Sequence, residues 1–414
     1  MPRAELRFRP FGFVARQISA TMWASLMSTF LLHTARTLTP TTEIPDAGIL
    51  VRDGVIAAIG PREGMSLPAG AQEISAVEQT AVPGFIDVHI HGAGGHDVME
   101  GTDEALAAVA RTLARHGTTS LVATTVTASL DDTCRSVEGI ARFITQQLKT
   151  DDARAEVLGV HYEGPFLNKA RRGVHPTESI QLPSIELLER LLQAASGNAR
   201  ILTIAPELPG AVPCIEAART AGVVVAMGHT DATYEEARAA ISRGVRHAVH
   251  VYNAMRPFSH RDSGVIGAVL TSTEVTAELI ADGVHVEEAA MRLLLQAKGP
   301  GCVILISDGL SATGMPDGKY NLGKFEVTVS NGVCRNAEGK LAGSTLTLDR
   351  ALRNVVALGV TLADALRMLT TNPAKLLGIE FKKGALRVGA DADIVLLDQN
   401  LQLTNVWTRG IPLN

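Results

Sequence analysis

The stretch Pro83-Gly84-Phe85-Ile86-Asp87-Val88-His89-Ile90-His91-Gly92-Ala93-Gly94-Gly95 decides the fold of this chain. It predicts one buried strand that ends in two histidines and is followed by a glycine-rich turn. Successive side chains of a strand point to opposite faces, so His89 and His91 share a face. Neutral imidazole is a common metal ligand, and this pair is placed to hold one divalent cation. The plain alternative is two half-exposed histidines at a strand end, and the rest of the chain decides between the two.

Seven further apolar runs follow that strand, and helical patterns lie between most of them. The eight runs cover residues 85–91, 118–125, 157–163, 201–206, 223–229, 247–253, 276–282 and 303–308. The helical patterns cover residues 102–116, 131–149, 185–195, 212–221, 234–243 and 287–296. Runs rich in Val, Ile and Leu suit strands buried on both faces, and their alternation with helices is typical of parallel βαβ units. Eight such units predict an α/β fold, a (β/α)8 TIM-like barrel.

A doubly wound open sheet is the alternative architecture. No Gly-x-Gly-x-x-Gly follows the first strand into a helix, which argues against a dinucleotide-binding fold of that type. Two long connections, residues 164–184 and 309–347, show no regular pattern. Irregular loops of this length within a compact domain are usually functional, so we expect both to serve the activity.

Short β-like runs occur at both ends of the chain. Near the N-terminus, residues 48–51 and 55–60 flank Asp53-Gly54, which is a hairpin signal. Residues 394–397 and 403–407 resume the same pattern near the C-terminus. We therefore expect residues 29–82 and 380–414 to form one small β-sandwich domain, and residues 83–379 to form the barrel. Residues 1–28 are expected to be a poorly ordered extension, with Met27 as the candidate start of the ordered domain.

The composition excludes several classes of function. The chain has 414 residues and a net charge of −5 without a basic stripe, so neither nucleic acid nor an anionic membrane surface is expected as a partner. No run of about 18 apolar residues occurs, so no membrane span is expected. Cys134, Cys214, Cys302 and Cys334 are scattered without a Cys-x-x-Cys pair, which indicates reduced thiols and a cytoplasmic protein.

Polar residues gather where the predicted strands end, and barrel enzymes build their active sites at the C-terminal ends of the strands. The residues concerned are His89, His91, Glu163, His229, His250 and Asp308. Taken singly, each could be a helix cap or a hydrogen-bonded polar side chain. Four histidines and a glutamate on one rim instead favour a metal site, and a donor set without thiolate suits a catalytic one.

The simplest assignment gives Glu163, His229 and His250 to one ion. His89 and His91 would hold a second ion, with Glu163 as the bridge. Two ions ~3.5–4 Å apart suit hydrolysis, and a bound ion lowers the pKa of water from ~15.7 to roughly 7. Asp308 would then take a proton from that water and later give it to a departing amine. We expect one or two divalent cations per subunit, with Zn or Fe preferred over the other metals that such donors accept.

The combined motifs are similar to those of a known family. Pro-Gly-Phe-Ile-Asp-Val-His-Ile-His, His-Tyr-Glu-Gly-Pro-Phe, Gly-His-Thr, His-Val-Tyr-Asn-Ala-Met and Ser-Asp-Gly resemble the N-acetylglucosamine-6-phosphate deacetylases of the amidohydrolase superfamily. The resemblance runs from about residue 29 to the C-terminus. It implies a barrel with a small β domain, and hydrolysis of N-acetylglucosamine 6-phosphate to glucosamine 6-phosphate and acetate. Action on the galactosamine epimer or another small amide stays open, as does a barrel that has lost catalysis and serves as a scaffold.

The resemblance also implies roles for individual residues. Glu163, His229 and His250 match the principal metal ligands, Asp308 matches the general acid and base, and His175 matches the histidine that polarises the acetyl carbonyl. The implied substrate contacts are Val174, His175, Asn253, Ala254, Arg261, His285, Leu341, Ala342 and Gly343. Arg261 would reach the phosphate in a neighbouring subunit, which implies a homodimer. Members of the family vary at the histidine pair of the first strand, so the occupancy of the second metal position stays open.

Two other branches of the superfamily fit less well. A dihydroorotase or hydantoinase would place a carboxylated lysine at the end of the fourth strand, where this chain has Ile204-Ala205-Pro206-Glu207. A nucleoside or base deaminase would place an acid close to the metal histidines, and no His-x-x-Glu follows His229 or His250.

Overall fold

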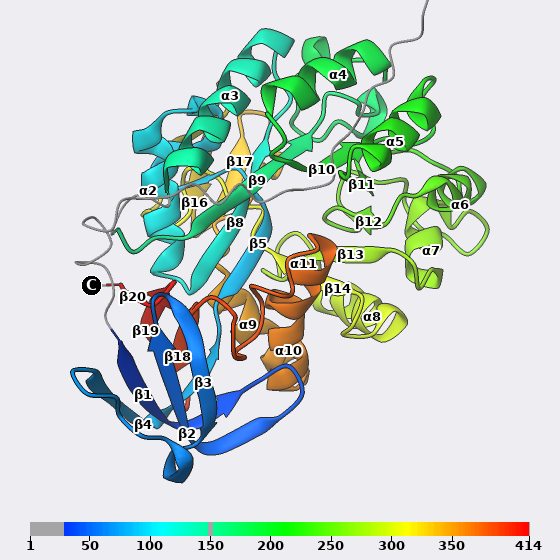
Figure 1. The fold of residues 1–414 in the computed structure, drawn as a ribbon. Coiled ribbons are helices and arrows are strands. Elements are labelled where there is room, and N and C mark those ends of the chain that lie inside the picture. The colour runs from blue at the N-terminus through cyan, green and yellow to red at the C-terminus, as the bar shows by residue number, and fades with distance from the viewer. Residues whose placement is uncertain (1–28, 148–151, 414) are drawn as a thin grey trace, which may run out of the picture.

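The computed structural model describes residues 29–147 and 152–413 of the chain. Its strands form two main sheets, one of eight strands and one of seven (Figure 1). The expectations for residues 1–28, including a start at Met27, lie outside the described residues. Within the described residues, no helix is both long and apolar enough to cross a membrane.

The eight-stranded sheet is parallel and contains every strand predicted for the barrel. In sheet order its strands are β5 (Phe85–Ile90), β8 (Thr118–Thr125), β9 (Glu156–Glu163), β10 (Ala199–Ile204), β11 (Val224–Met227), β12 (His247–Ala248), β13 (Thr276–Ile280) and β14 (Val303–Ile306). Between β14 and β5, Asp308 N donates to His89 O at 3.0 Å and His91 N donates to Gly309 O at 2.7 Å. These two bonds bring the outer strands together, and the predicted barrel is confirmed.

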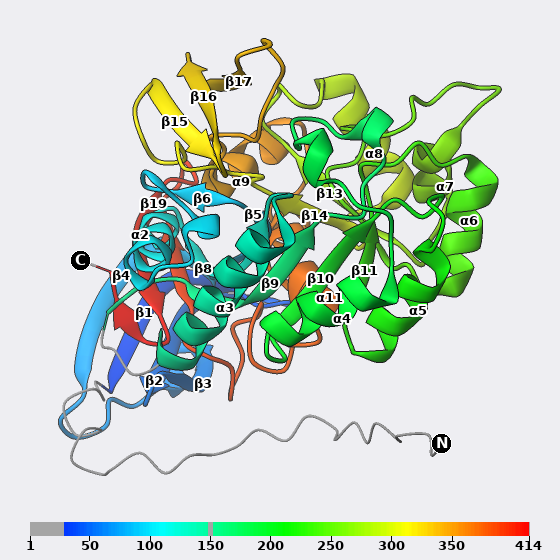
Figure 2. The same ribbon diagram turned by 90° about the horizontal axis from the view of Figure 1, so that it is seen from above.

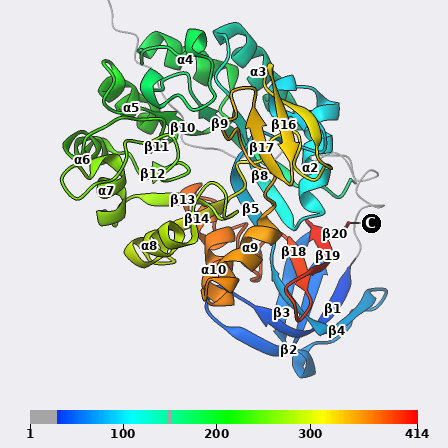
Figure 3. The same cartoon turned by 180° about the vertical axis from the view of Figure 1, so that it is seen from behind.

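Helices pack around the outside of the strands (Figures 1 and 3). They are α2 (Asp103–Ala114), α3 (Leu130–Gln146), α4 (Ile185–Ala194), α5 (Ala211–Thr220), α6 (Tyr234–Arg243), α7 (Gly264–Thr271), α8 (Glu288–Lys298), α9 (Leu348–Ala357), α10 (Leu362–Leu369) and α11 (Thr371–Leu376). Polar caps fix where several begin: Thr102 accepts from Ala105 N at α2, and Thr233 forms a capping box with Glu236 at α6. The six predicted helices are present at their predicted positions.

The seven-stranded sheet joins the two ends of the described chain, which lie side by side as blue and red strands in Figure 1. Its strands are β1 (Phe30–Leu38), β2 (Glu43–Arg52), β3 (Val55–Pro61), β4 (Gln72–Pro83), β18 (Ile394–Leu397), β19 (Leu403–Thr408) and β20 (Ile411–Pro412). The predicted hairpin turn is present, with positive φ angles of 56° at Asp53 and 76° at Gly54. A separate apolar core that includes Phe30 and Trp407 supports this sheet. The small β domain made from both chain ends is confirmed, whereas its exact boundaries stay a prediction.

The two long connections differ from each other. Residues 164–184 contain only two short 3-10 turns, Lys169–Arg171 and Thr177–Ser179. Residues 309–347 are not irregular throughout, because they carry an antiparallel sheet of β15 (Gly318–Leu322), β16 (Phe325–Ser330) and β17 (Val333–Asn336). A small hairpin of β6 (Gly92–Ala93) and β7 (His96–Asp97) lies near it (Figure 2). The sheet packs on Val126 and Leu310, which follow β8 and β14, and so covers the end of the barrel where the polar residues gather.

Candidate active site

The first cluster of polar side chains forms around one oxygen of Glu163, the last residue of β9. Glu163 Oε1 lies 3.1 Å from Nε2 of His229 and 2.9 Å from Nε2 of His250. The two histidines follow β11 and β12, and their Nε2 atoms are 3.1 Å apart. His89, on β5, brings its Nε2 within 3.3 Å of the same oxygen. Histidines on or just after three other strands therefore converge on the carboxylate that ends β9.

The second oxygen of Glu163 faces a different set of groups. Glu163 Oε2 lies 3.2 Å from His91 Nε2 and 3.3 Å from His175 Nε2. Asp308 Oδ1 lies 3.3 Å from His91 Nε2 and 3.6 Å from His89 Nε2. Glu163 thus stands between the two groups that the sequence assigns to two ions, and Asp308 stands beside the second group.

The hydrogen bonds at the outer ring nitrogens show which form two of these histidines adopt. His91 Nδ1 lies 3.0 Å from Thr124 O, and His229 Nδ1 lies 3.0 Å from Arg171 O. A carbonyl oxygen can only accept, so each Nδ1 carries a hydrogen. The lone pair of each neutral ring is then on Nε2 and faces the cluster, which is how a metal-binding histidine is usually held.

His175 has the opposite arrangement. Its Nδ1 accepts from Thr127 N at 3.2 Å, so the hydrogen of the neutral ring is on Nε2. Gly173 allows this loop to approach closely: its φ is 58°, and a Cβ there would lie 3.3 Å from Cε1 of His229. His175 therefore points a hydrogen-bond donor, not a lone pair, at the cluster.

The carboxylates of the cluster are held in their charged form. Burial alone would raise the pKa of Glu163, but interactions with His89 and His229 hold that pKa well below its usual value. Burial likewise acts to raise the pKa of Asp308, and a hydrogen bond with His91 and the charge of His89 lower it. Burial also lowers the pKa of His229 to about 4, so this ring is neutral. Burial acts to lower the pKa values of His89 and His91, but the nearby carboxylates raise both, that of His91 to about 10, so a cation that binds there would displace protons from these two rings.

The donor set fits a divalent metal ion. Three triads have ligand atoms within 4.8 Å of one another: His89, Glu163 and His250; His89, His91 and Asp308; Glu163, His175 and His229. Nε2 of His89 is buried, points into the cluster and has no hydrogen-bond partner. Nitrogen and oxygen donors without thiolate are typical of catalytic sites. The tautomer of His175 argues that this residue does not belong among the ligands.

The backbone is strained where it presents the cluster. His229, His250 and Asp308 have positive φ angles of 47°, 27° and 48°. Such conformations cost non-glycine residues of order 1–3 kcal/mol each and persist only where surrounding contacts fix them. Their grouping at one rim supports a functional role for the rim.

Most of the predicted substrate residues lie around the cluster. Asn253 N donates to His250 O at 2.9 Å, and Ala254 O accepts from Thr230 N at 3.2 Å. These bonds place the loop after β12 beside two members of the cluster.

The remaining predicted residues lie on three other segments. Val174 packs against the apolar cluster beneath β15–β17. The segment Leu341-Ala342-Gly343 is tied to Asp308, whose O accepts from Ser344 N at 2.7 Å. His285 follows β13 and is paired with Asp282. Arg261 is exposed on the loop before α7.

Sequence analysis missed two carboxylates that support the site. Glu278 on β13 is fully buried, and its Oε2 lies 2.8 Å from His89 Nδ1. A glutamate within the apolar strand Thr276-Ala277-Glu278-Leu279-Ile280 was the available signal, because charged residues are almost never fully buried unless they are paired.

Glu207 is the second of these residues. It follows β10, at the position considered only for a carboxylated lysine. Its Oε1 accepts from Asn168 Nδ2 at 2.8 Å and from Asp231 N at 2.7 Å, and its Oε2 accepts from the hydroxyl of Thr230. Glu207 thereby holds the loop that carries His229.

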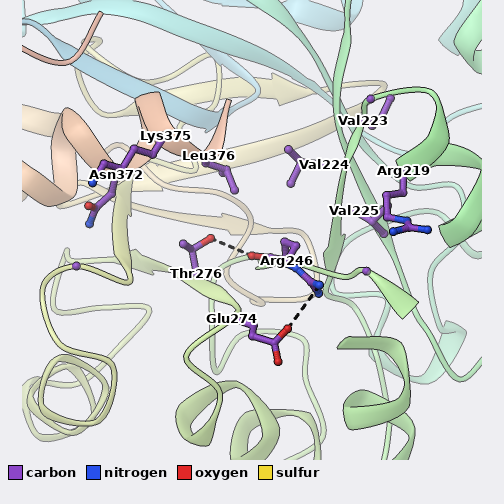
Figure 4. Close-up of a pocket in the computed structure, with 13 residues that line it drawn as sticks. Arg219, Val223, Val224, Val225, Arg246, Glu274, Thr276, Asn372, Lys375 and Leu376 are labelled. Carbon is purple, nitrogen blue, oxygen red and sulfur yellow. Dashed lines mark hydrogen bonds and ion pairs between the residues drawn. The ribbon is translucent and has the colours of Figure 1, made fainter. Parts of the chain in front are cut away.

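A separate cavity of about 570 Å³ opens at the other end of the barrel strands (Figure 4). It is lined by Val224 and Thr276, the first residues of β11 and β13, and by Arg219. In its wall, Arg246 pairs with Glu274 at 3.5 Å. No residue of the polar cluster lines this cavity, so it is not part of the candidate active site.

Comparison with known proteins agrees with this geometry. The chain is 38% identical to the N-acetylgalactosamine-6-phosphate deacetylase of Escherichia coli O157:H7, over 92% of this chain and 98% of that protein. It is 37% identical to the N-acetylglucosamine-6-phosphate deacetylase of Lysinibacillus sphaericus, over 87% of this chain and 92% of that protein.

Solved structures give the same result. The N-acetyl-D-glucosamine-6-phosphate deacetylase of Mycobacterium smegmatis superposes with a TM-score of 0.85 at 38% identity, over 93% of this chain and all of that one. The corresponding enzyme of Thermotoga maritima gives 0.83 at 29% identity, over 93% of this chain and 99% of that one. The model of the amidohydrolase family matches residues 80–412. The chain therefore belongs to the amidohydrolase family.

Proposed function

We propose that this chain is a metal-dependent deacetylase that hydrolyses N-acetylglucosamine 6-phosphate to glucosamine 6-phosphate and acetate. The observation that carries the proposal is the convergence of His229 and His250, at 3.1 and 2.9 Å, on one oxygen of Glu163 at the C-terminal rim of the barrel. The names of the relatives, deacetylases of two hexosamine 6-phosphates, support the substrate class. The reaction is the hydrolysis of a linear amide in amino-sugar metabolism.

Glu163, His229 and His250 would hold the first metal ion, and His89 and His91 a second one. A bound divalent cation lowers the pKa of water and stabilises the negative charge that develops on a carbonyl oxygen. Zn or Fe fits the nitrogen and oxygen donors. Glu163 is suited to bridge two ions because its two oxygens face different histidines.

Asp308 would move the proton during the reaction. Its carboxylate takes a proton from the water whose oxygen attacks the acetyl carbon. When the carbon–nitrogen bond breaks, Asp308 gives that proton to the nitrogen of the leaving amine. The products are acetate and the free amine, so water is the only co-reactant. The lowered pKa of Asp308, which its interactions with His91 and His89 maintain against burial, keeps it ready to act first as the base.

His175 would stabilise the developing charge on the acetyl oxygen. Because its Nδ1 accepts from Thr127 N at 3.2 Å, its Nε2 carries a hydrogen that can be donated to that oxygen. A donor fixed in this way needs no rearrangement when the charge appears. The hydrogen bond from Thr127 N is an observation of this chain that supports the role implied by family resemblance.

The remaining proposed contacts surround the sugar and its phosphate. Val174, Asn253, Ala254, His285 and the segment Leu341–Gly343 would contact the sugar. Arg261 would bind the phosphate in the active site of a second subunit, so a homodimer is part of the proposal. A guanidinium matches the geometry of a phosphate, and the exposure of Arg261 leaves it available to a partner. A cytoplasmic location is also proposed, supported by the free thiols of the four cysteines.

N-acetylgalactosamine 6-phosphate is the second candidate substrate. The observation that favours it is the 38% identity, over 98% of its length, to a deacetylase named for that epimer. The two sugars differ at one hydroxyl, and the chemistry at the acetamide is the same for both.

The deciding experiment measures acetate release from both epimers by the purified chain. We expect release that stops when a chelator removes the metal and returns when Zn²⁺ or Fe²⁺ is added. A clear preference for the glucosamine epimer supports the proposal, and release from the galactosamine epimer alone supports the second candidate. A metal-loaded chain that releases acetate from neither sugar refutes both.

A further inference from the structure

Glu278 is a buried carboxylate that the proposed reaction does not use. It lies in the middle of β13 and has no exposed surface. Removing a charged group from water is costly unless hydrogen bonds and opposite charges compensate. At this buried position Glu278 therefore requires hydrogen-bond donors or positive charges as partners.

The partners of Glu278 include a residue of each proposed metal position. Its Oε2 lies 2.8 Å from Nδ1 of His89 and accepts from the backbone N of His250 at 3.0 Å. Its Oε1 lies 2.9 Å from Nε2 of His247, whose Nδ1 lies 2.7 Å from Thr276 Oγ1. His89 belongs to the second metal position and His250 to the first, so one oxygen contacts both.

The contact with His89 decides the form of that ring. Oε2 already accepts a hydrogen from a backbone N–H, so it acts as an acceptor and Nδ1 of His89 must carry the hydrogen. In the neutral ring the lone pair is then on Nε2, which is buried and points into the cluster. His91 and His229 are backed by backbone carbonyls, whereas His89 is backed by a carboxylate. A carboxylate makes an imidazole a stronger ligand.

The contact with His250 acts on the backbone. His250 has a φ of 27°, which is unfavourable for a residue with a side chain. Besides the bond from His250 N to the side chain of Glu278, Val251 N donates to the main-chain oxygen of Glu278 at 3.1 Å. The same residue therefore anchors the strained turn that presents a ligand of the first position.

We propose that Glu278 is a positioning residue of a two-metal centre: it fixes His89 as a strong ligand of the second ion while it anchors His250 at the first. The inference rests on the metal centre of the proposed function and deepens it. It makes the binding of the second ion depend on Glu278, which is neither a proposed metal ligand nor a proposed substrate contact.

The test compares three variants by equilibrium dialysis of the metal-free chain against Zn²⁺ alone. In Glu278→Gln, the amide oxygen can keep both hydrogen bonds of Oε2. The charge is lost, and the bond to His247 must reverse because the amide nitrogen can only donate, which is the change that the His247 variant controls for. We expect the second Zn²⁺ to bind about tenfold more weakly and the first to bind unchanged. In Glu278→Ala, which also loses the hydrogen bonds, we expect a loss of about 100-fold at the second position and weaker binding at the first.

His247→Gln is the matched control, because it alters the same buried network without touching His89. If His247→Gln weakens the second Zn²⁺ as much as Glu278→Gln does, the effect is one of general packing and the proposal fails. A Glu278→Gln chain that binds two ions as tightly as the unchanged chain also overturns it. So does an unchanged chain that binds a single Zn²⁺ at saturation.

A second measurement needs no folded Glu278 variant. Nitrogen-15 NMR of the unchanged metal-free chain, with the His89 signals assigned from their absence in His89→Gln, reports which ring nitrogen carries the hydrogen. We expect a hydrogen on Nδ1, and a ring whose only hydrogen is on Nε2 overturns the proposal. Neither experiment contains a sugar, so a chain that binds two ions but releases no acetate refutes the proposed function and leaves this inference intact.

Discussion

At the scale of single residues, a histidine offers a lone pair or a hydrogen according to what its other ring nitrogen contacts. His229 donates from Nδ1 to Arg171 O, so its Nε2 is a potential ligand. His175 accepts at Nδ1 from Thr127 N, so its Nε2 is a donor. Histidine thus serves at this site both as a potential metal ligand and as a hydrogen-bond donor, and the contact of the other ring nitrogen decides which.

Asp308→Asn tests the proton transfer. The amide cannot accept a proton from water, so we expect turnover to fall by about 10²–10⁴-fold while the first metal equivalent stays bound. Acetate release and metal content measure the two effects. Asp131→Asn, which alters a carboxylate 87% exposed on α3, is the control and should keep full turnover. Near-normal turnover in Asp308→Asn would remove Asp308 from the mechanism.

His285 gives a pH dependence that can be measured on the metal-free chain. Burial acts to lower its pKa, but the hydrogen bond at 2.7 Å to Asp282 and the charges of Asp282 and Asp308 raise it above the usual value. The folded chain therefore binds the proton more tightly than the unfolded chain. The resulting stabilisation is complete below an unfolded pKa of about 6.5 and is lost as the pH rises through the higher folded pKa.

The expected result is a larger loss of stability in His285→Gln at pH 6 than at pH 9. Urea unfolding at both values measures it. The exposed His260→Gln serves as the control for loss of an imidazole. If the difference in the free energy of unfolding between His285→Gln and the unchanged chain grew with pH, the pKa of His285 would be lowered by folding and not raised.

At the scale of elements, one buried lysine connects the barrel to the small domain. Lys383 Nζ lies 2.9 Å from Glu156 at the start of β9, and 3.0 and 2.8 Å from Asp391 and Asp393 before β18. The side chain of Lys383 is only 5% exposed. Three carboxylates therefore surround one ammonium group, and Arg409 adds a second ion pair to Glu156 at 3.5 Å.

Lys383→Met is expected to destabilise the fold by roughly 3–5 kcal/mol, because it removes the counter-ion of Asp391 and Asp393. The free energy of unfolding in urea measures the effect. Lys319→Met removes an exposed ion pair with Glu326 and should change stability little. An equal effect of both variants would show that the buried ion pairs of Lys383 contribute no more to stability than the exposed ion pair of Lys319.

Sequence analysis missed α7, α9, α10, α11 and β15 to β17. The lack of a clear pattern explains α7 and the three strands, but not α9 and α10, each of which buries one face. Helix α7 is Gly264-Val265-Ile266-Gly267-Ala268-Val269-Leu270-Thr271, which is apolar on nearly every face and buried, so it shows no amphipathic period. Strands β15 to β17 are short, and their pairing partners are decided by neighbours rather than by their own pattern. Long amphipathic helices such as α3 were predicted because one face packs and the other meets water.

At the scale of the whole molecule, the proposed function has Arg261 of one subunit bind the phosphate in the active site of a second. Arg261 lies exposed on its loop. If each active site takes residues from two subunits, two variants that are each impaired at a different residue should recover activity when they are mixed.

Arg261→Ala should raise the KM for the phosphorylated sugar far more than for the unphosphorylated one. Mixed with Asp308→Asn under conditions that exchange subunits, it should regain about a quarter of the normal activity, since half of the dimers carry one complete site of two. Activity of the mixture against time measures the exchange. No recovery in mixed dimers would place Arg261 in its own subunit's site or outside both.

The sequence by itself determined the eight barrel strands, the small domain from both chain ends, and the residues now found at the rim. These features are local: apolar runs, short motifs and hairpin signals are legible within a few residues. The family followed from the same motifs, and the comparisons confirmed it.

Only the tertiary structure decided how those residues work together. Glu278 and His89 are 189 positions apart, and His175 and Thr127 are 48 apart, so no local pattern could reveal either contact. The tautomer of each histidine and the charge of each buried carboxylate depend on such contacts. The sequence identifies the side chains that can bind a metal ion. The contacts made in the closed barrel determine which nitrogen of each histidine carries a hydrogen and which carries the lone pair.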